Sequence, residues 1–165
     1  MTEGERALLA ARFRLLLIIT GVVVVVDQIT KFYIERNFFL HESVTLIENF
    51  LDITSVRNQG AAFGILADSS LRKPFFIIVS IAAGLFILWY IHHLERDQDF
   101  LKFPLSLIFA GAMGNLIDRV RLGEVIDFID VHWYQYHWPA FNVADSAISI
   151  GVTLLLWDLW RIERK

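Results

Sequence analysis

Four aspartates lie in one stretch of the chain that is otherwise apolar enough to enter a lipid bilayer. Asp118, Asp127, Asp130 and Asp145 all fall within Gly114 to Ser146. An ionised side chain near the membrane interior is disfavoured by about 2.5 kcal/mol or more. The presence of several carboxylates around two membrane segments therefore indicates a shared role. We interpret two of them as a catalytic pair.

Asp127 and Asp130 belong to the run VIDFIDV, whose apolar residues indicate a buried, partly extended segment. Two carboxylates that share a site cannot both ionise comfortably, so one keeps a proton while the other acts as a base. Such a pair can activate water against an amide. Asp145 is a third candidate, although a carboxylate near the start of a helix also simply complements the helix dipole. The residues alone leave Asp127 and Asp130 nearly equal.

His132 and His137 lie close to these aspartates and offer a second interpretation, a metal site. No HExxH or other recognised ligand spacing is present, so we expect no metal ion and no cofactor. Cysteine is absent from the chain, which removes thiol nucleophiles and thiolate ligands. Any nucleophile is therefore an oxygen group or water.

Other polar residues occur at helical spacing inside apolar segments. Asp27 and Lys31 are four apart and share a helical face, so we interpret them as an ion pair that orients the first helix. Asn115 and Asp118 follow small residues at three- and four-residue steps and are placed to orient a neighbouring helix. Arg119 suits a salt bridge and a contact to a substrate carbonyl equally well.

The last apolar segment carries a further polar stripe, formed by Asn142, Asp145, Ser146, Ser149 and Thr153. Residues with these spacings lie along one side of a helix. We expect that side to face protein or water.

The elements that must hold these residues are membrane helices. Of the 165 residues, 56% are hydrophobic and 20% are charged, which is too apolar for an ordinary soluble domain. We predict a single integral membrane domain over residues 1–165, mainly α-helical, with four transmembrane helices and a small extracytoplasmic β-sheet. The predicted helices span residues 15–34, 75–91, 103–120 and 140–160.

A β-rich insertion is predicted between the first two helices, at residues 37–73. Ser43–Ile47 and Phe50–Val56 are rich in β-branched and aromatic residues, and Glu48 and Asn49 separate them as a turn. An open sheet edge cannot lie in hydrocarbon. We therefore expect this antiparallel sheet on the outer surface.

Charge and aromatic residues bear on partners and orientation. The formal net charge is -3 and no Lys/Arg-rich run exists, so we expect no nucleic-acid partner. Arginine and lysine residues near both chain ends favour cytoplasmic termini. The aromatic cluster Trp133, Tyr134, Tyr136 and Trp138 indicates a membrane interface.

Five motifs together resemble the bacterial lipoprotein signal peptidases, also called signal peptidase II. They are VVDQITK (Val25–Lys31), RNQGAAFG (Arg57–Gly64), GNLIDR (Gly114–Arg119), VIDFIDVHW (Val125–Trp133) and PAFNVADS (Pro139–Ser146). The motifs follow the family order from the first predicted helix through the fourth, with no departure inside them. Five ordered motifs are far more specific than any one alone.

The resemblance implies an aspartyl protease that cleaves signal peptides from prolipoproteins already carrying diacylglycerol on a cysteine. By motif position, the catalytic pair falls on Asp127 and Asp145, and Asp130 receives no role. Supporting or substrate-positioning roles fall on Asp27, Lys31, Asn58, Gly60, Asn115, Asp118, Arg119, Asn142 and Ala144.

The resemblance also implies a multi-pass protein of the bacterial inner membrane, in contact with membrane lipid. Both termini are expected in the cytoplasm and the active site toward the outer face. A mobile outer helix is expected near residues 61–73, and the cyclic peptide globomycin is expected to inhibit. We expect a monomer.

Two other classes of function stay open on the residues alone. A proton-coupled membrane transporter also uses intramembrane carboxylates, but no inverted pair of similar halves or broken helices is evident in the sequence. A non-enzymatic assembly subunit, held to partners by its small-residue stripes, is the third interpretation.

Overall fold

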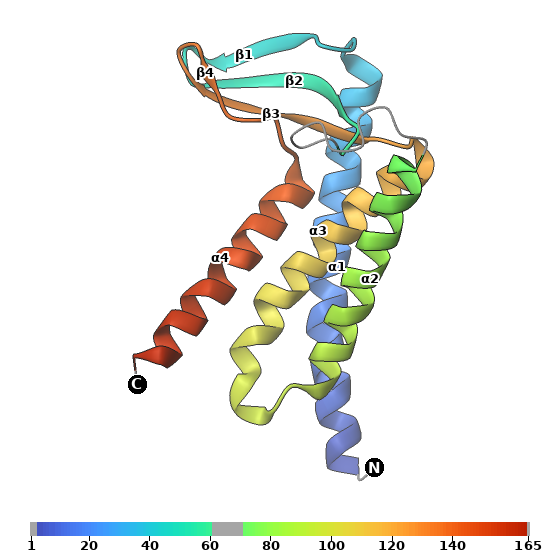
Figure 1. The fold of residues 1–165 in the computed structure, drawn as a ribbon, viewed down its shortest axis with the longest axis vertical. Coiled ribbons are helices and arrows are strands. Elements are labelled where there is room, and N and C mark those ends of the chain that lie inside the picture. Colours follow the sequence, from blue (N-terminus) through green and yellow to red (C-terminus); the bar gives the residue numbers. More distant parts are fainter. Residues whose placement is uncertain (1–2, 61–70, 165) are drawn as a thin grey trace.

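The computed structural model describes residues 3–60 and 71–164, as four long helices topped by a small sheet (Figure 1). The helices are α1 (Glu3–Asn37), α2 (Arg72–His93), α3 (Lys102–Arg121) and α4 (Val143–Glu163), and a short 3-10 helix, η2 (Arg96–Leu101), precedes α3. The strands are β1 (Ser43–Ile47), β2 (Leu51–Asn58), β3 (Val125–Trp133) and β4 (Tyr136–His137). The predicted fold class is confirmed. The helix expected near residues 61–73 falls mainly on 61–70, which lie outside the described residues.

All four long helices are long and apolar enough to cross a membrane. Their outer faces carry large apolar side chains that are exposed in the described part of the chain, such as Val22, Leu85 and Leu156, at 60%, 62% and 61%. Apolar surface on this scale is unfavourable in water and suits lipid tails. The helices therefore present lipid-facing surfaces.

All four long helices begin at residues other than those predicted. α1 starts at Glu3 rather than residue 15, because the segment before the apolar run is rich in Glu, Ala, Leu and Arg, which are strong helix formers. α4 starts at Val143 rather than residue 140, because Phe141 still pairs with Ile129 and Asn142 caps the helix. α2 and α3 extend a few residues past the predicted ranges 75–91 and 103–120.

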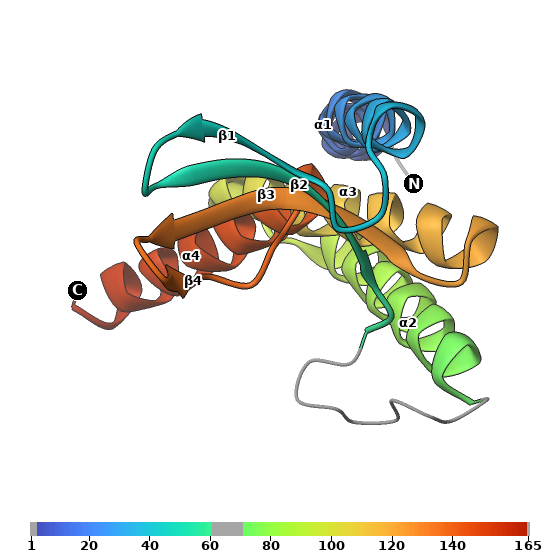
Figure 2. The ribbon, with the colours of Figure 1, turned by 90° about the horizontal axis from the view of Figure 1, so that it is seen from above.

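The sheet is antiparallel, with strand order β1-β2-β3-β4. The predicted hairpin of β1 and β2 is confirmed, and Asn49 adopts a positive φ of 59° in its turn. β3 then pairs with β2 so that Asp127 lies opposite Val56, and a β-bulge interrupts β2 between Ile53 and Val56. A bulge bends its strand and redirects the side chains that follow it. Viewed from above, the strands cross over α3 and α4 (Figure 2).

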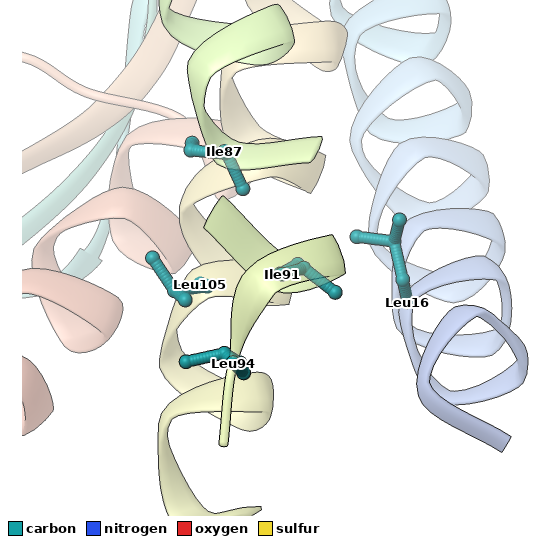
Figure 3. Close-up of a cluster of buried hydrophobic side chains, with 5 residues drawn as sticks. All are labelled: Leu16, Ile87, Ile91, Leu94 and Leu105. Atoms are coloured by element: carbon teal, nitrogen blue, oxygen red, sulfur yellow. The ribbon is translucent and has the colours of Figure 1, made fainter. Parts of the chain in front are cut away.

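α3 is the central helix, because it packs against α1, α2 and α4. One apolar cluster joins α1, α2 and α3 in the half of the bundle away from the sheet (Figure 3); it consists of Leu16, Ile87, Ile91, Leu94 and Leu105. A second cluster, Ile34, Ile126 and Phe128, lies where α1 meets β3. Between membrane helices, such side chains stabilise the bundle through close van der Waals packing and not through removal from water. The two clusters hold the helices and the sheet in fixed relation.

The two ends of the molecule contain different elements. The start of α1, the helix η2 and the end of α4 lie together at one end, and the sheet lies at the other (Figure 1). Residues on β3 and at the start of α4 therefore meet beside the sheet, far from both termini.

Candidate active site

Asp127 lies on β3 and is almost completely buried, with 1% of its surface exposed. The side-chain amide of Asn58, at the end of β2, donates to Asp127 Oδ2 at 2.9 Å, and that of Asn142 donates to Oδ1 at 2.7 Å. The bulge in β2 precedes Asn58 and fixes where this side chain points. Each carboxylate oxygen is thus held by one amide.

Asp145 lies in the first turn of α4, where it forms a capping box with Asn142. Its backbone N–H donates to Asn142 Oδ1 at 2.9 Å, and its Oδ2 accepts from the Asn142 N–H at 3.3 Å. Its Oδ1 accepts from the amide of Asn115 on α3 at 2.7 Å. Capping and the interhelical hydrogen bond together fix this carboxylate at the helix start.

Asn142 links the two aspartates. Its Oδ1 binds the backbone of Asp145, while its Nδ2 donates to Asp127 Oδ1 and also lies 3.2 Å from Asn115 Oδ1. One fully buried amide therefore sets the relation between β3, α3 and α4. This local network brings Asp127 and Asp145 to one site although they are distant in the sequence.

The pKa of the Asp127 carboxyl is raised to about 7, first by burial and second by the negative charge of Asp145. Hydrogen bonds from Asn58 and Asn142 and the positive charge of Lys31 act in the opposite direction. The Asp127 carboxyl is therefore partly protonated near neutral pH.

A buried lysine, Lys31, contacts residues that hydrogen-bond to the site. Lys31 Nζ lies 2.9 Å from Asp27 Oδ2, 2.9 Å from Asp118 Oδ2 and 2.9 Å from Asn115 Oδ1. The predicted Asp27–Lys31 ion pair is confirmed, and it extends to α3. Because Asn115 also holds Asp145, the lysine positions one of the two aspartates indirectly.

The two acids around Lys31 also fasten the backbone near the site. Asp27 Oδ1 accepts from the Ala144 N–H at 2.9 Å, and Asp118 Oδ2 accepts from the Ile126 N–H at 3.3 Å. Ala144 itself is fully buried. The ion pair therefore ties α1 and α3 to the residues that directly precede both aspartates.

Gln28 is a member of this network that the sequence reasoning missed. Its amide donates to Asp118 Oδ1 at 3.0 Å, and to Asp27 Oδ2 and the Gly114 carbonyl at 3.2 Å each. A polar amide next to Asp27 within an apolar helix was the available signal.

Gly60 and Arg119 both lie near the ring of Phe76, beside the site. Gly60 has a φ of 84°, which favours glycine, and its N–H donates to Asn58 Oδ1 at 2.8 Å. That bond leaves the Asn58 Nδ2 directed at Asp127. The guanidinium of Arg119 lies 5.4 Å from the ring centre of Phe76 and interacts electrostatically with both aspartates.

Asp130 lies elsewhere on the sheet. Its carboxylate contacts His137 Nδ1 at 2.9 Å, and its strand partner is Asp52. The rings of His132 and His137 stack with their centres 4.6 Å apart. Among the described residues, no group of three or more His, Asp or Glu is arranged to hold a metal ion.

The polar stripe on α4 is buried at its start and exposed further along the helix. Asn142 is buried, but Ser149 and Thr153 are exposed on the flank of the helix. The Thr153 hydroxyl donates to the Ser149 carbonyl at 2.8 Å, which satisfies it within the helix. A hydroxyl bonded in this way needs no protein or water neighbour.

Two pockets open beside the aspartates. A pocket of about 380 Å³ at the Asp127 side is lined by Val56, Arg57, Asn58, Gln59, Asp127, Pro139 and Ala140. A pocket of about 460 Å³ at the Asp145 side is lined by Trp138, Phe141, Asp145, Ser146, Ser149 and Ile150. The segment from Pro139 to Phe141 borders both, so each aspartate is reached from its own side.

Comparison with known proteins gives consistent matches over most of the chain. The model of the Signal peptidase (SPase) II family matches residues 19–161. A lipoprotein signal peptidase from Syntrophotalea carbinolica is 56% identical over 151 residues, covering 92% of this chain and 94% of that protein. One from Geobacter metallireducens is 50% identical, covering 93% of this chain and 94% of that protein. A bacterial membrane enzyme solved at 2.3 Å resolution is 41% identical, with a TM-score of 0.80 over 88% of this chain and 87% of its own.

Proposed function

Because the chain belongs to the signal peptidase II family, we propose that it is an aspartic endopeptidase acting on diacylglyceryl-modified prolipoproteins. Family membership makes it a multi-pass membrane peptidase that removes signal peptides from lipoproteins, in place of the transporter and assembly-subunit alternatives. The aspartic mechanism rests on one observation. Asn142 joins Asp127 and Asp145 in a network where the pKa of Asp127 is about 7.

The proposed reaction uses the single proton of this pair. One carboxylate takes a proton from water, whose oxygen attacks the carbonyl carbon of the scissile amide. The other carboxylic acid gives its proton to the carbonyl oxygen. When the tetrahedral intermediate collapses, the leaving nitrogen takes the proton that the first carboxylate accepted from water, and a hydroxyl of the intermediate returns a proton to the second carboxylate. The products are a free carboxyl end on the signal peptide and a free amine on the lipoprotein.

The supporting residues have positioning roles in this proposal. Asn58 and Asn142 occupy the Asp127 oxygens with hydrogen bonds, and Asn115 occupies Asp145 Oδ1. Fixed hydrogen bonds hold the carboxylates at the geometry that the reaction requires. Arg119, which interacts electrostatically with both aspartates, is proposed to contact a substrate carbonyl.

The proposed orientation follows from the two ends of the molecule. The aspartates lie beside the sheet, and both chain ends lie at the opposite end (Figure 1). With cytoplasmic termini, the site faces the outer side of the bacterial inner membrane. A substrate anchored by diacylglycerol then keeps its acyl chains in lipid while the amide next to the lipidated cysteine reaches the carboxylates. We expect globomycin to compete for this site.

A gel-shift cleavage assay with purified protein and a diacylglyceryl-modified prolipoprotein tests the proposal. We expect the native protein to cleave with and without a metal chelator, and Asp127→Asn to cleave at less than a thousandth of the native rate, on the order expected for loss of an essential catalytic group. Asp130→Asn is the matched control, because Asp130 lies on the same strand but contacts His137. Full activity of Asp127→Asn, or loss of native activity with the chelator, would contradict an aspartic mechanism.

A further inference from the structure

The pocket beside Asp145 opens on an exposed flank of α4 that includes Ser149 and Ile150. Its volume of about 460 Å³ lies within the range of ligand-binding pockets, roughly 300–1,000 Å³. The chain descends from β4 to the start of α4 (Figure 1), and the pocket lining combines Trp138 and Phe141 of this connection with Ser149 and Ile150 of α4. The pocket thus lies between the sheet and the first two turns of a membrane helix.

The lining of this pocket combines hydroxyl groups with apolar surface. The Ser146 hydroxyl donates to the Asn142 carbonyl at 2.9 Å. The Ser149 hydroxyl is exposed and makes no hydrogen bond to any part of the chain that the structure describes. Trp138 and Ile150 are 69% and 53% exposed beside it. A free hydroxyl and an indole N–H next to apolar surface suit an ester group at the membrane interface.

The proposed reaction restricts where the lipid of the substrate can lie. If the lipidated cysteine flanks the scissile bond, its glyceryl esters must lie within a side chain's reach of the aspartates. The pocket beside Asp145 meets this requirement because the aspartate itself forms part of its wall. This step rests on the proposed function.

Two other pockets fit the glyceryl group less well. The pocket beside Asp127 is bordered by Arg57, Asn58 and Gln59 at the end of the sheet, not by a lipid-facing helix. An apolar pocket of about 220 Å³ includes Leu155 and Leu159 of α4. Leu155 is ten residues from Asp145, a distance of about 15 Å along a helix. That pocket is too far away for esters attached beside the scissile bond.

We propose that the pocket between Trp138 and Ile150 binds the diacylglyceryl group of the substrate. The Ser149 hydroxyl donates to an ester carbonyl, and Trp138 and Ile150 contact the first methylenes of the acyl chains. The chains continue along the exposed flank of α4 into the bilayer. This makes Ser149 a specificity-determining residue for the lipid and not for the peptide.

Photo-crosslinking tests the location without requiring turnover. The probe is a prolipoprotein peptide whose S-diacylglyceryl group carries a diazirine on the acyl carbons nearest the esters, bound to Asp127→Asn protein. Mass spectrometry is expected to find the label on Trp138–Phe141 and Ser146–Ile150, and excess unlabelled lipidated peptide is expected to remove it. Label confined to α2 or to Leu155–Leu159, or label that the competitor does not remove, would overturn the proposal.

Kinetics with the otherwise native protein provide a second test. Ser149→Phe fills the pocket and is expected to raise KM for the long-chain diacylglyceryl substrate about tenfold while kcat changes little, as loss of substrate binding does. Ser149→Ala removes one hydrogen bond and is expected to raise KM about three- to fivefold. Thr153→Phe, one turn further along the same flank, is the control and is expected to leave KM unchanged.

The outcomes separate this inference from the proposed function. Equal KM values for Ser149→Phe and Thr153→Phe, with both proteins unfolding at the native midpoint, would overturn the lipid pocket alone. Absence of cleavage by the native protein would overturn the proposed function, while the crosslinking result would still show where the lipid binds.

Discussion

The pKa of the Asp127 carboxyl results from opposing effects, and a single substitution can remove one of them. Burial and the charge of Asp145 raise the pKa of its carboxyl to about 7, and the Asn58 amide, 2.9 Å from Oδ2, lowers it. A hydrogen bond donated to a carboxylate favours the charged form, so its removal favours the proton. The shared proton of the proposed pair therefore depends on Asn58.

Asn58→Ala is expected to shift the alkaline limb of the pH profile. Native kcat/KM should fall as pH rises through about 7, because the pair then loses its proton. Without the Asn58 amide the pKa of Asp127 rises further, so the limb should move to higher pH while maximal activity falls. The measurement is kcat/KM from pH 5 to 9, with Gln59→Ala as control because its amide contacts Glu124. An alkaline limb that moves to lower pH would contradict the assigned role.

Asp127 and Asp130 show which properties of a single residue can be predicted from the sequence. Both follow an isoleucine on β3, and apolar neighbours predicted the buried strand for both. Their difference comes from contacts to other elements, since Asp127 meets Asn58 and Asn142 while Asp130 meets His137. Spacing along one strand does not specify those contacts. Only the family motifs separated the two aspartates.

At the contact between α1 and α3, one buried cation, Lys31, forms ion pairs with two acids. Lys31, Asp27 and Asp118 are all fully buried, and each Lys31 ion pair measures 2.9 Å. Removing one partner of such a group leaves buried charge uncompensated. The stability of the helix pair should therefore depend on Lys31 far more than on any exposed ion pair.

Lys31→Met is expected to lower the free energy of unfolding by about 3–5 kcal/mol. Arg121→Ala, which removes a partly exposed ion pair with Glu35, is expected to lower it by no more than about 1 kcal/mol. Denaturant unfolding in detergent micelles measures both. Equal losses for the two variants would show that the buried group does not hold the helices together.

The close approach of α3 to α1 and α4 depends on Gly114. A Cβ at this position would lie 2.7 Å from Asp27 Oδ2 and 3.1 Å from Ala144 Cβ. Gly114→Ala is therefore expected to destabilise the fold by about 1–3 kcal/mol, as overpacking does. Gly21→Ala is the matched variant on α1, where no described atom beyond the nearby helix backbone lies within 4 Å of the added Cβ, and it should stabilise by up to about 1 kcal/mol. Unfolding midpoints that shift in the same direction would contradict this view of the interface.

The helices and the first hairpin were predictable because their signals are local. Apolar runs of membrane length and the turn at Glu48 and Asn49 lie within short windows of sequence. The early start of α1, the late start of α4 and the pairing of β3 with β2 were not predicted. The last two depend on long-range pairing, such as Phe141 with Ile129 and Asp127 with Val56, which no local pattern encodes.

In the molecule as a whole, the charged chain ends lie far from the proposed active site. The sheet and both aspartates lie at one end, and α1 begins and α4 finishes at the other (Figure 1). In the proposed orientation the sheet lies outside the inner membrane and the chain ends lie in the cytoplasm.

The absence of native cysteine makes this orientation directly testable. Gln135→Cys introduces a thiol in the turn between β3 and β4, and Glu163→Cys introduces one at the end of α4. In spheroplasts, a membrane-impermeant maleimide is expected to label only the first variant, and both after detergent is added. Labelling of Glu163→Cys alone before detergent would reverse the orientation.

The most direct measurement of the central claim is kcat/KM for Asp127→Asn, Asp145→Asn and the double variant on one diacylglyceryl-modified substrate. Groups that act as a unit are strongly non-additive, so each single variant should lose about 10⁴-fold or more and the double variant little beyond that. Substantial activity in either single variant, or losses that multiply in the double variant, would contradict a catalytic pair formed by Asp127 and Asp145.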